Sequence, residues 1–497
     1  MIPKSICLWL VAAYLLVLTP GLHAEEKTPR EEAQADTISS DVIIPGMVGK
    51  TFTDDLSGIR QRGILRALVS YSRTDFFLQG ARPRGLFVEL LNQYESFLNK
   101  GRKRNTPKTS IKYVPVTFDR LIPALLAGEG DIAVGHLTVT PGRVRHIDFA
   151  RDERVKVDEL LVMHQRVEGI DSLEDLSGRS VYVKRASSYA EHLRGLNAHF
   201  ASIGRQPVDI RLADPHLVTE DLIELVNAGV IELTVADDFR ARLWEKVLEN
   251  IVVRDDVKIN EGGRLGWGVR KENPELLQNL QAFAKKVQGG TRLGNILFRR
   301  YYGNTRWIKN PLAENEREKL AQLSDLFIKY GKQYNFDWLA VLAQAYQESG
   351  LDHSVVSPAG AVGIMQLLPT TATDPNVGIA DFQDLEQNIH AGTKYLAFLR
   401  DRYYSGPEFD DEDRFAFSWA AYNAGPARVR SMRRRAEQMG LDPNRWFGHV
   451  EYAALAIVGR ETYRYVRNIF KYYITYKIIG DIEEERVHRI KELQSEK

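Results

Sequence analysis

The segment ESGLDHSVVSPAGAVGIMQLLP, residues 348–369, indicates the fold and the chemistry of the second half of the chain. Apolar residues recur at helical spacing just before it, with Asp337 placed to cap this helix and Gly350 to end it. Glu348 therefore falls in the last helical turn, where the negative end of the helix dipole disfavours ionisation. If the site is also partly desolvated, the pKa of this carboxyl group rises further, which suits a proton donor near neutral pH.

Two further motifs follow the first one at fitting intervals: AYNAGPARV at 421–429 and ETYRYVRNI at 461–469. Helical patterns dominate this half, and strand signals disappear after residue 314. Three motifs in a fixed order are much more specific than any one of them. Together they resemble the catalytic domain of lytic transglycosylases of the soluble-transglycosylase type. The resemblance implies an all-α, lysozyme-like domain over residues 312–497.

The resemblance also implies the roles of individual residues. Glu348 is the expected catalytic acid and base, and Gly360 and Gly363 are expected to bring the backbone close to the glycan. Tyr465 is expected to approach the glutamate. The residues expected to bind the substrate are Ser357, Met365, Gln366, Tyr422, Asn423 and Tyr465.

In this family a single carboxyl group is enough, because the substrate supplies the nucleophile. Ordinary glycosidases use two carboxyl groups, roughly 5–5.5 Å apart when they retain configuration. A lytic transglycosylase instead protonates the oxygen that bridges N-acetylmuramic acid (MurNAc) and N-acetylglucosamine (GlcNAc) in their β-1,4 bond. The same Glu then takes a proton from the muramyl C6 hydroxyl, and a 1,6-anhydro sugar forms without water.

Two alternatives remain open from the sequence. A hydrolytic muramidase requires a positioned water and a second carboxylate, for which the candidates in nearby sequence are Asp352, Asp374, Asp381 and Asp384. Asp side chains commonly hydrogen-bond nearby backbone groups in turns, so loop and capping roles are favoured for these residues instead. A ligand sensor with a weak lytic domain requires a broken motif, and none of the three motifs is broken.

The first half of the chain alternates short β-like runs with helical patterns, which predicts parallel βαβ units. Asp119 is a candidate helix cap and Gly128 a candidate stop for the helix between them. The expected architecture is a two-lobed α/β domain over residues 56–303, with a cleft between the lobes. The runs that carry this prediction are GILRALVSY (63–71), KYVPV (112–116), DIAVG (131–135), SVYVKR (180–185), VIELTV (230–235) and LGWGVR (265–270).

One stretch of this half, FDRLIPALLAGEGDIAVGHLTVTPGRVRHIDFA at 118–150, resembles the bacterial solute-binding proteins that capture amino acids. The resemblance implies a periplasmic-binding-protein-like domain in which Arg143 pairs with a ligand carboxylate, a geometry that arginine suits. Asp237 is the expected partner of the ligand ammonium. The supporting contacts implied are Tyr71, Thr138, Ser187 and Ser188. Gly135 and His136 stand where members of the family often have small hydroxyl residues. The identity of the ligand therefore stays open. A domain that keeps the fold but has lost tight binding is the alternative.

The N-terminus reads as a signal peptide. Lys4 precedes the 13-residue apolar run from Ile6 to Leu18, which is too short to span a bilayer as a helix, and a cleavage site after about Ala24 follows. Residues 25–55 are polar and predict a linker. The single cysteine, Cys7, lies inside the apolar run, so the mature chain is expected to have no disulfide and no cysteine metal site.

Length and composition agree with this organisation. A chain of 497 residues is too long for one ordinary core, and its 44% hydrophobic and 27% charged residues are typical of a globular protein. A net charge of +1 gives no overall attraction to nucleic acid. No cofactor or metal is expected. The two resemblances, in this order behind a signal peptide, imply a periplasmic protein attached peripherally at the inner face of the outer membrane. The partners that they imply are peptidoglycan glycan strands and an amino-acid or muropeptide effector.

Overall fold

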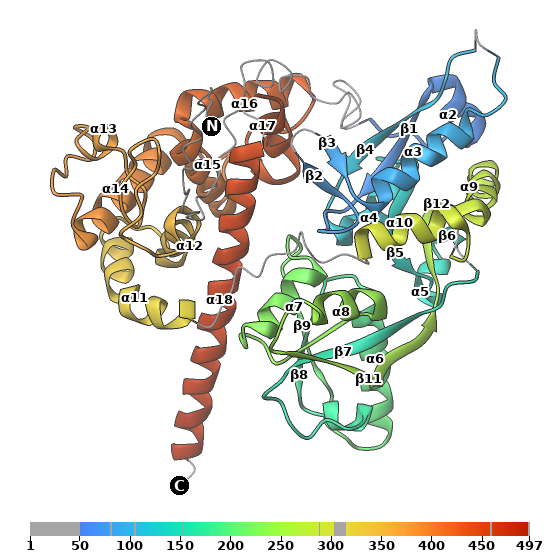
Figure 1. The fold of residues 1–497 in the computed structure, drawn as a ribbon, viewed down its shortest axis with the longest axis horizontal. Coiled ribbons are helices and arrows are strands. Elements are labelled where there is room, and N and C mark those ends of the chain that lie inside the picture. The colour runs from blue at the N-terminus through green and yellow to red at the C-terminus, as the bar shows by residue number, and fades with distance from the viewer. Residues whose placement is uncertain are drawn as a thin grey trace, which may run out of the picture.

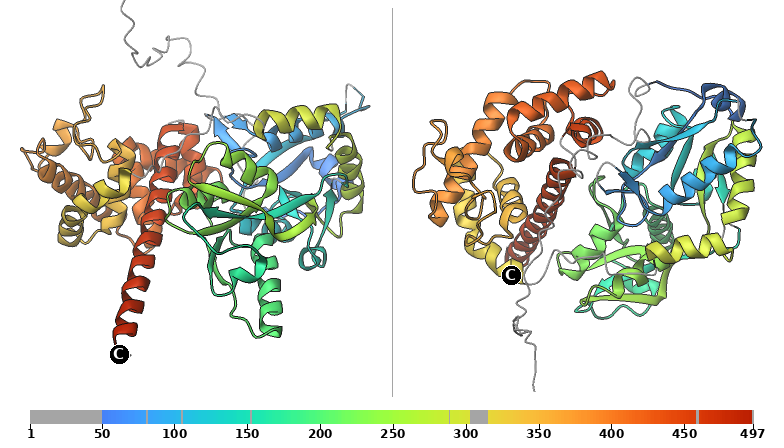
Figure 2. Two further views of the ribbon diagram at one scale, coloured as in Figure 1. Left: turned by 60° about the horizontal axis from the view of Figure 1, so that its bottom comes forward. Right: turned by 45° about the horizontal axis from the view of Figure 1, so that its top comes forward.

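The computed structural model describes residues 50–495, with gaps at 80–81, 104–105, 152, 288, 303–314 and 458–459. The predicted signal peptide, Cys7 and most of the predicted linker lie outside these residues. Two units make up the described chain: an α/β unit of two lobes and a helical unit (Figure 1). The long helix α18, Arg460–Ser495, runs between the two units in every view (Figures 1 and 2).

The first lobe is built on a sheet with the strand order β4-β1-β5-β12-β6. Strand β1 pairs in parallel with β4 and β5, as predicted, but β12 is antiparallel to β5 and β6. The all-parallel expectation fails at β12 because the chain returns through this strand from the second lobe. The strands are β1 (Ile64–Val69), β4 (Ser110–Pro115), β5 (Ile132–Thr138), β6 (Ile147–Arg151) and β12 (Leu265–Arg270), beside a small hairpin of β2 (Phe77–Gln79) and β3 (Arg82–Arg84).

The second lobe has a sheet of its own, with the order β11-β7-β10-β8-β9. Strands β8, β9 and β10 pair in parallel, whereas β7 runs antiparallel to β10 and β11. The chain crosses between the lobes twice, from β6 into β7 and from β11 into β12, and these two crossings form the hinge. The strands are β7 (Val157–His164), β8 (Ser180–Val183), β9 (Asp209–Leu212), β10 (Leu233–Asp237) and β11 (Ile251–Gly263).

Helices cover both sheets of the α/β unit with their apolar sides. The predicted stop at Gly128 is correct, since its φ of 75° ends helix α4 in the left-handed conformation that glycine tolerates. The predicted cap at Asp119 is wrong, because Asp119 lies inside the short 3-10 helix Phe118–Arg120 that precedes α4. The helices are α2 (Leu56–Arg62), α3 (Leu86–Leu98), α4 (Leu121–Leu126), α5 (Pro141–Val144), α6 (Ser188–Ser202), α7 (Thr219–Asn227), α8 (Asp238–Glu245), α9 (Pro274–Val287) and α10 (Arg292–Tyr302), with a 3-10 turn at Leu173–Leu176.

The helical unit packs around a core rich in aromatic side chains, with Trp419 and Trp446 fully buried. Helix α12 and helix α18 pack against each other inside it. No described helix is both long and apolar enough to cross a membrane. The helices are α11 (Asn315–Gln333), α12 (Trp338–Ser349), α13 (Pro369–Ala372), α14 (Leu385–Tyr403), α15 (Asp411–Ala424), α16 (Pro426–Gln438), a π-helical turn at Trp446–Val450, α17 (Glu451–Ile457) and α18.

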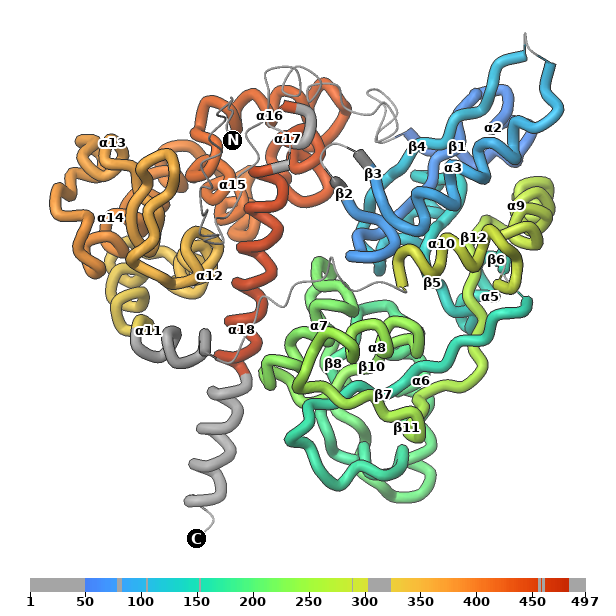
Figure 3. The backbone as a smooth tube through the Cα atoms, in the orientation of Figure 1, coloured from blue at the N-terminus to red at the C-terminus, as the bar shows by residue number. Residues whose placement is uncertain are grey.

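Helix α18 joins the two units physically. Both lobes lie on the same side of it (Figure 3). Ile474 packs against the core of the helical unit and against a core of the α/β unit. The ring of His216 in the second lobe contacts Phe447 at a tilt and Phe470 edge to face, with ring centroids 4.6 and 5.1 Å apart. A movement of the second lobe would therefore change contacts that α18 makes.

Candidate functional site

Glu348 lies where the sequence predicts it, in the last turn of α12. Asp337 caps the start of this helix and Gly350, with a φ of 65°, ends it. The Tyr465 hydroxyl donates a hydrogen bond of 2.5 Å to Glu348 Oε1. Burial raises the pKa of Glu348 to about 7, the bond from Tyr465 lowers it in part, and the charge of Glu461 raises it. At neutral pH the carboxyl group is thus poised between its two protonation states.

Packing between α12 and α18 positions Tyr465. The Tyr473 hydroxyl donates to Asp337 Oδ2 over 2.7 Å, and Tyr472 meets Tyr346 edge to face with ring centroids 4.6 Å apart. These contacts fix α18 along α12. Tyr465 is 6% exposed, so little water competes for its hydroxyl group.

Asn388 of α14 stabilises the loop after Glu348 through hydrogen bonds. The Asn388 side chain accepts a hydrogen bond from the Met365 backbone amide at 2.8 Å. In contrast to the prediction, the Met365 side chain has no exposed surface and cannot line a substrate site. Its carbonyl instead accepts a 2.8 Å hydrogen bond from the Tyr422 hydroxyl, whose pKa is raised by burial and by the charge of Glu348. Tyr422 therefore lies near the acid while it fixes the loop.

Two other predicted residues of the loop also stabilise it. Ser357 Oγ accepts a hydrogen bond from the amide of Ala361 at 3.0 Å. Gln366 adopts a positive φ of 48°, and its side-chain amide donates to the carbonyls of Val355 and Gly363 over 2.9 and 2.8 Å. Both side chains are half-buried, so each retains some surface.

Gly363 has a different reason to be glycine than the one predicted. Its φ is 82°, and a Cβ atom there would stand 2.6 Å from Nδ2 of Asn388. The close neighbour is thus a buried side chain of the protein and not a glycan. Gly360, with a φ of 81°, has open space at its Cβ position.

Asn423 connects the second and third motifs. Its Oδ1 accepts a 2.7 Å hydrogen bond from the hydroxyl of Thr462. Thr462 and Glu461 were missed as site residues, although both belong to the quoted ETYRYVRNI segment. Their position one helical turn before Tyr465 on α18 was the available signal.

Three of the four acidic residues named as a possible second carboxylate have the local roles that the sequence favours. Asp384 caps α14 by accepting from the Gln387 amide. Asp352 accepts from the Ser354 amide, and Asp374 from the Asn376 amide, each at 2.9 Å. Among the residues that the structure describes, no cluster of His, Cys, Asp and Glu is arranged to hold a metal ion.

In the cleft between the lobes, Arg143 is already paired. Its Nε lies 3.0 Å from Oε1 of Glu191, across the cleft in the second lobe. Its two terminal nitrogens donate to the carbonyls of Thr138 and Ala186, each over 2.9 Å. The protein's own carboxylate thus occupies the group that was predicted to take a ligand carboxylate.

Asp237 is also occupied, by Arg240. Arg240 is buried, with nitrogens 3.0 Å from Asp75, 3.3 Å from Asp237 and 3.4 Å from Glu220. Burial raises the pKa of Asp237 to about 6, against the opposing effect of Arg240. The cavity that remains beside Arg240 and Lys184 measures about 40 Å³, room for only a few water molecules.

Of the other residues predicted to line the cleft, Ser187 and Ser188 line its cavity and Tyr71 does not. Ser188 lies in the cleft and donates from its hydroxyl to Thr138 Oγ1 over 2.9 Å, which bridges the lobes. Ser187 caps helix α6. Tyr71 does not form a wall of the cleft cavity; its ring lies 5.1 Å beneath the guanidinium of Arg467 on α18. The prediction for Tyr71 is wrong because the strand end that carries it faces the helical unit.

Comparison with known proteins agrees with both units. The family described as "Transglycosylase SLT domain" matches residues 325–442, and "Bacterial extracellular solute-binding proteins, family 3" matches residues 70–304. A curated protein of Desulfosudis oleivorans, named membrane-bound lytic murein transglycosylase F, is 30% identical over 84% of this chain and 90% of its own. The protein of the same name from Stutzerimonas stutzeri is 28% identical over 79% and 77%.

Among solved structures, an ancestral arginine-binding protein bound to glutamine aligns with 49% of this chain and 99% of its own length. Its sequence identity is 21% and the TM-score is 0.40. The family match over residues 70–304, and not this alignment, identifies the α/β unit as solute-binding-protein-like.

Proposed function

The chain belongs to the membrane-bound lytic murein transglycosylase F family, and from this premise we propose that Glu348 is its single catalytic acid and base. The protein is a peptidoglycan lytic transglycosylase, a lyase, that carries a solute-binding-protein-like first half. The observation that carries the residue assignment is the half-buried Glu348 with its pKa near 7 and its hydrogen bond from Tyr465.

The proposed reaction has two proton transfers at one carboxyl group. Protonated Glu348 gives its proton to the oxygen that bridges MurNAc and GlcNAc, and the bond to C1 breaks. The carboxylate then accepts the proton of the muramyl C6 hydroxyl as that oxygen bonds to C1. A pKa near 7 suits both steps, because neither protonation state is strongly disfavoured at neutral pH. Tyr465 supports the ionised state by donating its hydrogen bond.

The substrate is proposed to meet Glu348 between the loop that follows it and the second motif. Tyr422 and Asn423 are the proposed contacts to the reacting sugar, and Ser357 and Gln366 the proposed contacts on the loop. Support comes from the partial exposure of all four residues and from the interaction between Tyr422 and Glu348.

One observation favours the hydrolytic alternative: a second carboxylate, Glu461, is close enough for its charge to raise the pKa of Glu348. In a muramidase, Glu461 would activate water. In a lytic transglycosylase it has no proton to move and only raises the pKa of Glu348. Glu461→Gln distinguishes the two, since a hydrolase loses its base and a lytic transglycosylase retains most of its activity.

The test of the activity uses residues 25–497, purified and incubated with murein sacculi in the presence of EDTA. Mass spectrometry is expected to find 1,6-anhydromuropeptides as the main products. Reducing-end products would move the enzyme to the hydrolases.

Location is proposed from the sequence and the family. Cleavage after about Ala24 would release the chain into the periplasm, with peripheral attachment at the inner face of the outer membrane. N-terminal sequencing of the mature protein and fractionation of membranes washed with salt or carbonate test the two statements separately.

The first half is proposed to modulate the lytic half through a junction at Glu224. Glu224 of the second lobe is fully buried and accepts from Arg73 of the first lobe, Nη2 to Oε2, over 2.6 Å. Lys471 of α18 lies 3.6 Å from the same carboxylate. Since α18 also carries Tyr465, the lobe contact and the contact to the catalytic Glu348 share one helix.

An amino-acid-like or muropeptide effector would have to replace internal partners. Its carboxylate would displace Glu191 from Arg143, and its ammonium would displace Arg240 from Asp237. Because the cavity is about 40 Å³, such a ligand requires a different arrangement of the lobes, and it can shift the equilibrium only by its differential affinity. A coupling of about 1–3 kcal/mol to turnover is expected.

Calorimetry and turnover assays with murein stem-peptide fragments test the proposal on wild type, Arg143→Ala and Glu224→Gln. Arg143→Ala is expected to lose binding. Glu224→Gln is expected to bind but to lose the effect on turnover. If wild type binds no such peptide, or binds it without a change in turnover, the first half does not regulate the second in this way.

A further inference from the structure

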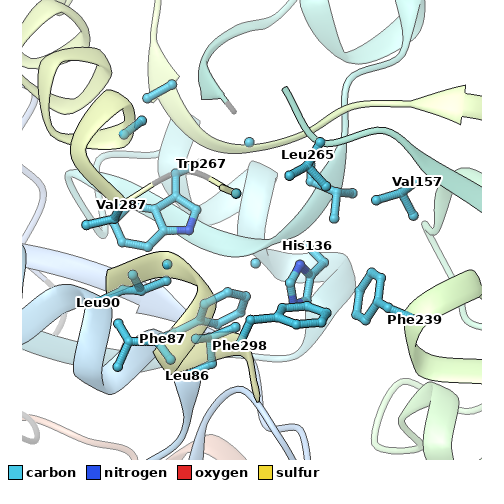
Figure 4. A pocket seen from close by; sticks show the side chains of 18 of the residues that line it. Leu86, Phe87, Leu90, His136, Val157, Phe239, Leu265, Trp267, Val287 and Phe298 are labelled. Atoms are coloured by element: carbon cyan, nitrogen blue, oxygen red, sulfur yellow. The ribbon is translucent and has the colours of Figure 1, made fainter. Parts of the chain in front are cut away.

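An apolar cavity of the α/β unit lies at the hinge, next to the polar cleft cavity, and the two share Phe87, Gly135 and His136 in their walls. The apolar cavity measures about 430 Å³, within the range of roughly 300–1,000 Å³ that is typical of small-molecule sites. Both chain crossings contribute to its wall, through Val155 to Val157 on one and Leu265 on the other. Strands β5, β6 and β12 and helices α3, α9 and α10 supply the rest from the first lobe, and α8 contributes from the second lobe. Figure 4 shows the side chains of this wall, with His136, Trp267 and Phe239 among those labelled.

Aromatic rings line this cavity in a nearly continuous row. His136 lies 4.9 Å from Phe87 and 5.0 Å from Phe239, measured between ring centroids. Trp267 lies 6.4 Å from Phe87 and 6.4 Å from Phe283. One ring nitrogen of His136 is used elsewhere, since Nε2 lies 3.1 Å from Asp75 Oδ1. The cavity therefore receives ring faces and aliphatic side chains, which suit an apolar ligand.

The rim of the cavity exposes apolar side chains that most surfaces would cover. Val155 is 39% exposed and Phe298 is 40% exposed, and both line the cavity. Ile296, on the same helix α10 as Phe298, is 46% exposed. Exposed apolar side chains that gather beside a cavity mark a place where a ligand enters or rests.

One cation at the rim is available for a ligand's polar end. Lys156 lines the cavity, is exposed, and forms no ion pair with any residue that the structure describes. The rim carboxylate, Asp238, is used locally, because its Oδ1 accepts a 2.7 Å hydrogen bond from the Phe239 amide. An anionic head group would pair with the exposed ammonium of Lys156.

We propose that this hinge cavity binds an amphiphile with one apolar chain and one anionic head, the chemistry of a medium-chain carboxylate. The chain lies among Phe87, Trp267 and Phe239, and the head group meets Lys156. Because the walls come from both lobes, the ligand stabilises the lobes in the arrangement described above. This cavity shares part of its wall with the polar cleft cavity, which has about a tenth of its volume.

Isothermal calorimetry with octanoate, decanoate and dodecanoate, each kept below its micelle concentration, tests the site. Affinity is expected to rise by about fourfold for each methylene group that is buried. Ala284 lines the cavity from α9, so Ala284→Trp fills it and is expected to weaken decanoate by at least about tenfold. The matched control is Ala282→Trp, on the same helix at an exposed position outside the cavity, which is expected to bind like wild type.

The head group is tested with decanol and decylamine, and with Lys156→Gln. Wild type is expected to prefer decanoate over both, and Lys156→Gln is expected to remove the preference over decanol. Melting temperatures establish that each variant is folded, and Phe298→Ala at the exposed rim is a second cavity variant should Ala284→Trp unfold. Absence of decanoate binding to wild type, or equal binding by folded wild type and Ala284→Trp, would overturn the proposal, and so would a preference for decylamine.

Discussion

The Tyr465 hydroxyl donates a 2.5 Å hydrogen bond to Oε1 of Glu348, although the two residues are 117 positions apart in the sequence. Burial and this bond act on the pKa of Glu348 in opposite directions, and burial has the larger effect. Tyr465 itself is buried, and its own pKa lies well above the usual value, so it stays a donor. The pair gives a carboxyl group that can both donate and accept a proton near neutral pH.

Glu348→Gln is expected to abolish most of the activity, because an amide has a similar shape but transfers no proton. General acid–base contributions are typically about 10²–10⁴-fold, and here one residue serves both steps. Release of anhydromuropeptides from sacculi measures the loss, with Glu461→Gln as the control that keeps the acid. Retention of a tenth of the wild-type rate by Glu348→Gln would show that another acid performs the reaction.

Tyr465→Phe is expected to move the pH profile and not only the rate. Without the hydroxyl group the ionised form of Glu348 loses a stabilising hydrogen bond, so its pKa rises above about 7. The alkaline limb of kcat/KM, which reports the acid in the free enzyme, should therefore shift to higher pH. An unchanged limb with a lower rate would assign Tyr465 a purely steric role.

The raised pKa of Glu348 is also expected to make the stability of the fold depend on pH. Folded Glu348 keeps its proton up to about pH 7, whereas in the unfolded chain it ionises near its ordinary pKa of 4.5. Between these values the folded state binds more protons, so this group lowers stability as the pH rises. The melting temperature of Glu348→Gln relative to wild type should accordingly be higher at about pH 8 than at about pH 5. A difference that does not vary with pH would mean that Glu348 titrates normally.

Arg240→Met is expected to destabilise the α/β unit strongly. It removes the buried cation that lies between Asp75, Glu220 and Asp237. Loss of one partner from a buried ion pair typically costs about 3–5 kcal/mol, because the remaining charges stay buried. Urea unfolding at neutral pH measures the change.

The matched control for this prediction is Arg242→Met, two residues along the same helix. Arg242 forms an exposed pair with Asp255, and such pairs contribute about 0–1 kcal/mol. Equal destabilisation by the two variants would show that the buried network does not hold the lobes together.

Local sequence patterns were sufficient to place the helix that carries Glu348 and some helix ends. Asp337 and Gly350 bound the helix of Glu348 as predicted, and Gly128 ends α4 as predicted. These outcomes depend on neighbouring residues only, through apolar spacing, capping and glycine's tolerance of positive φ. The Asp384 cap followed from the same kind of local chemistry.

An α/β unit followed by a helical unit, and a helix that ends at Glu348, could be predicted from the amino-acid sequence. The surroundings of the predicted site residues could not, because they depend on the three-dimensional packing. This packing turned the Met365 side chain into the core, placed Tyr71 under Arg467, and closed Arg143 on Glu191. The physical reason is that burial and ion pairing depend on segments distant in the chain, and a residue's sequence neighbours do not record which charges or rings will be folded against it.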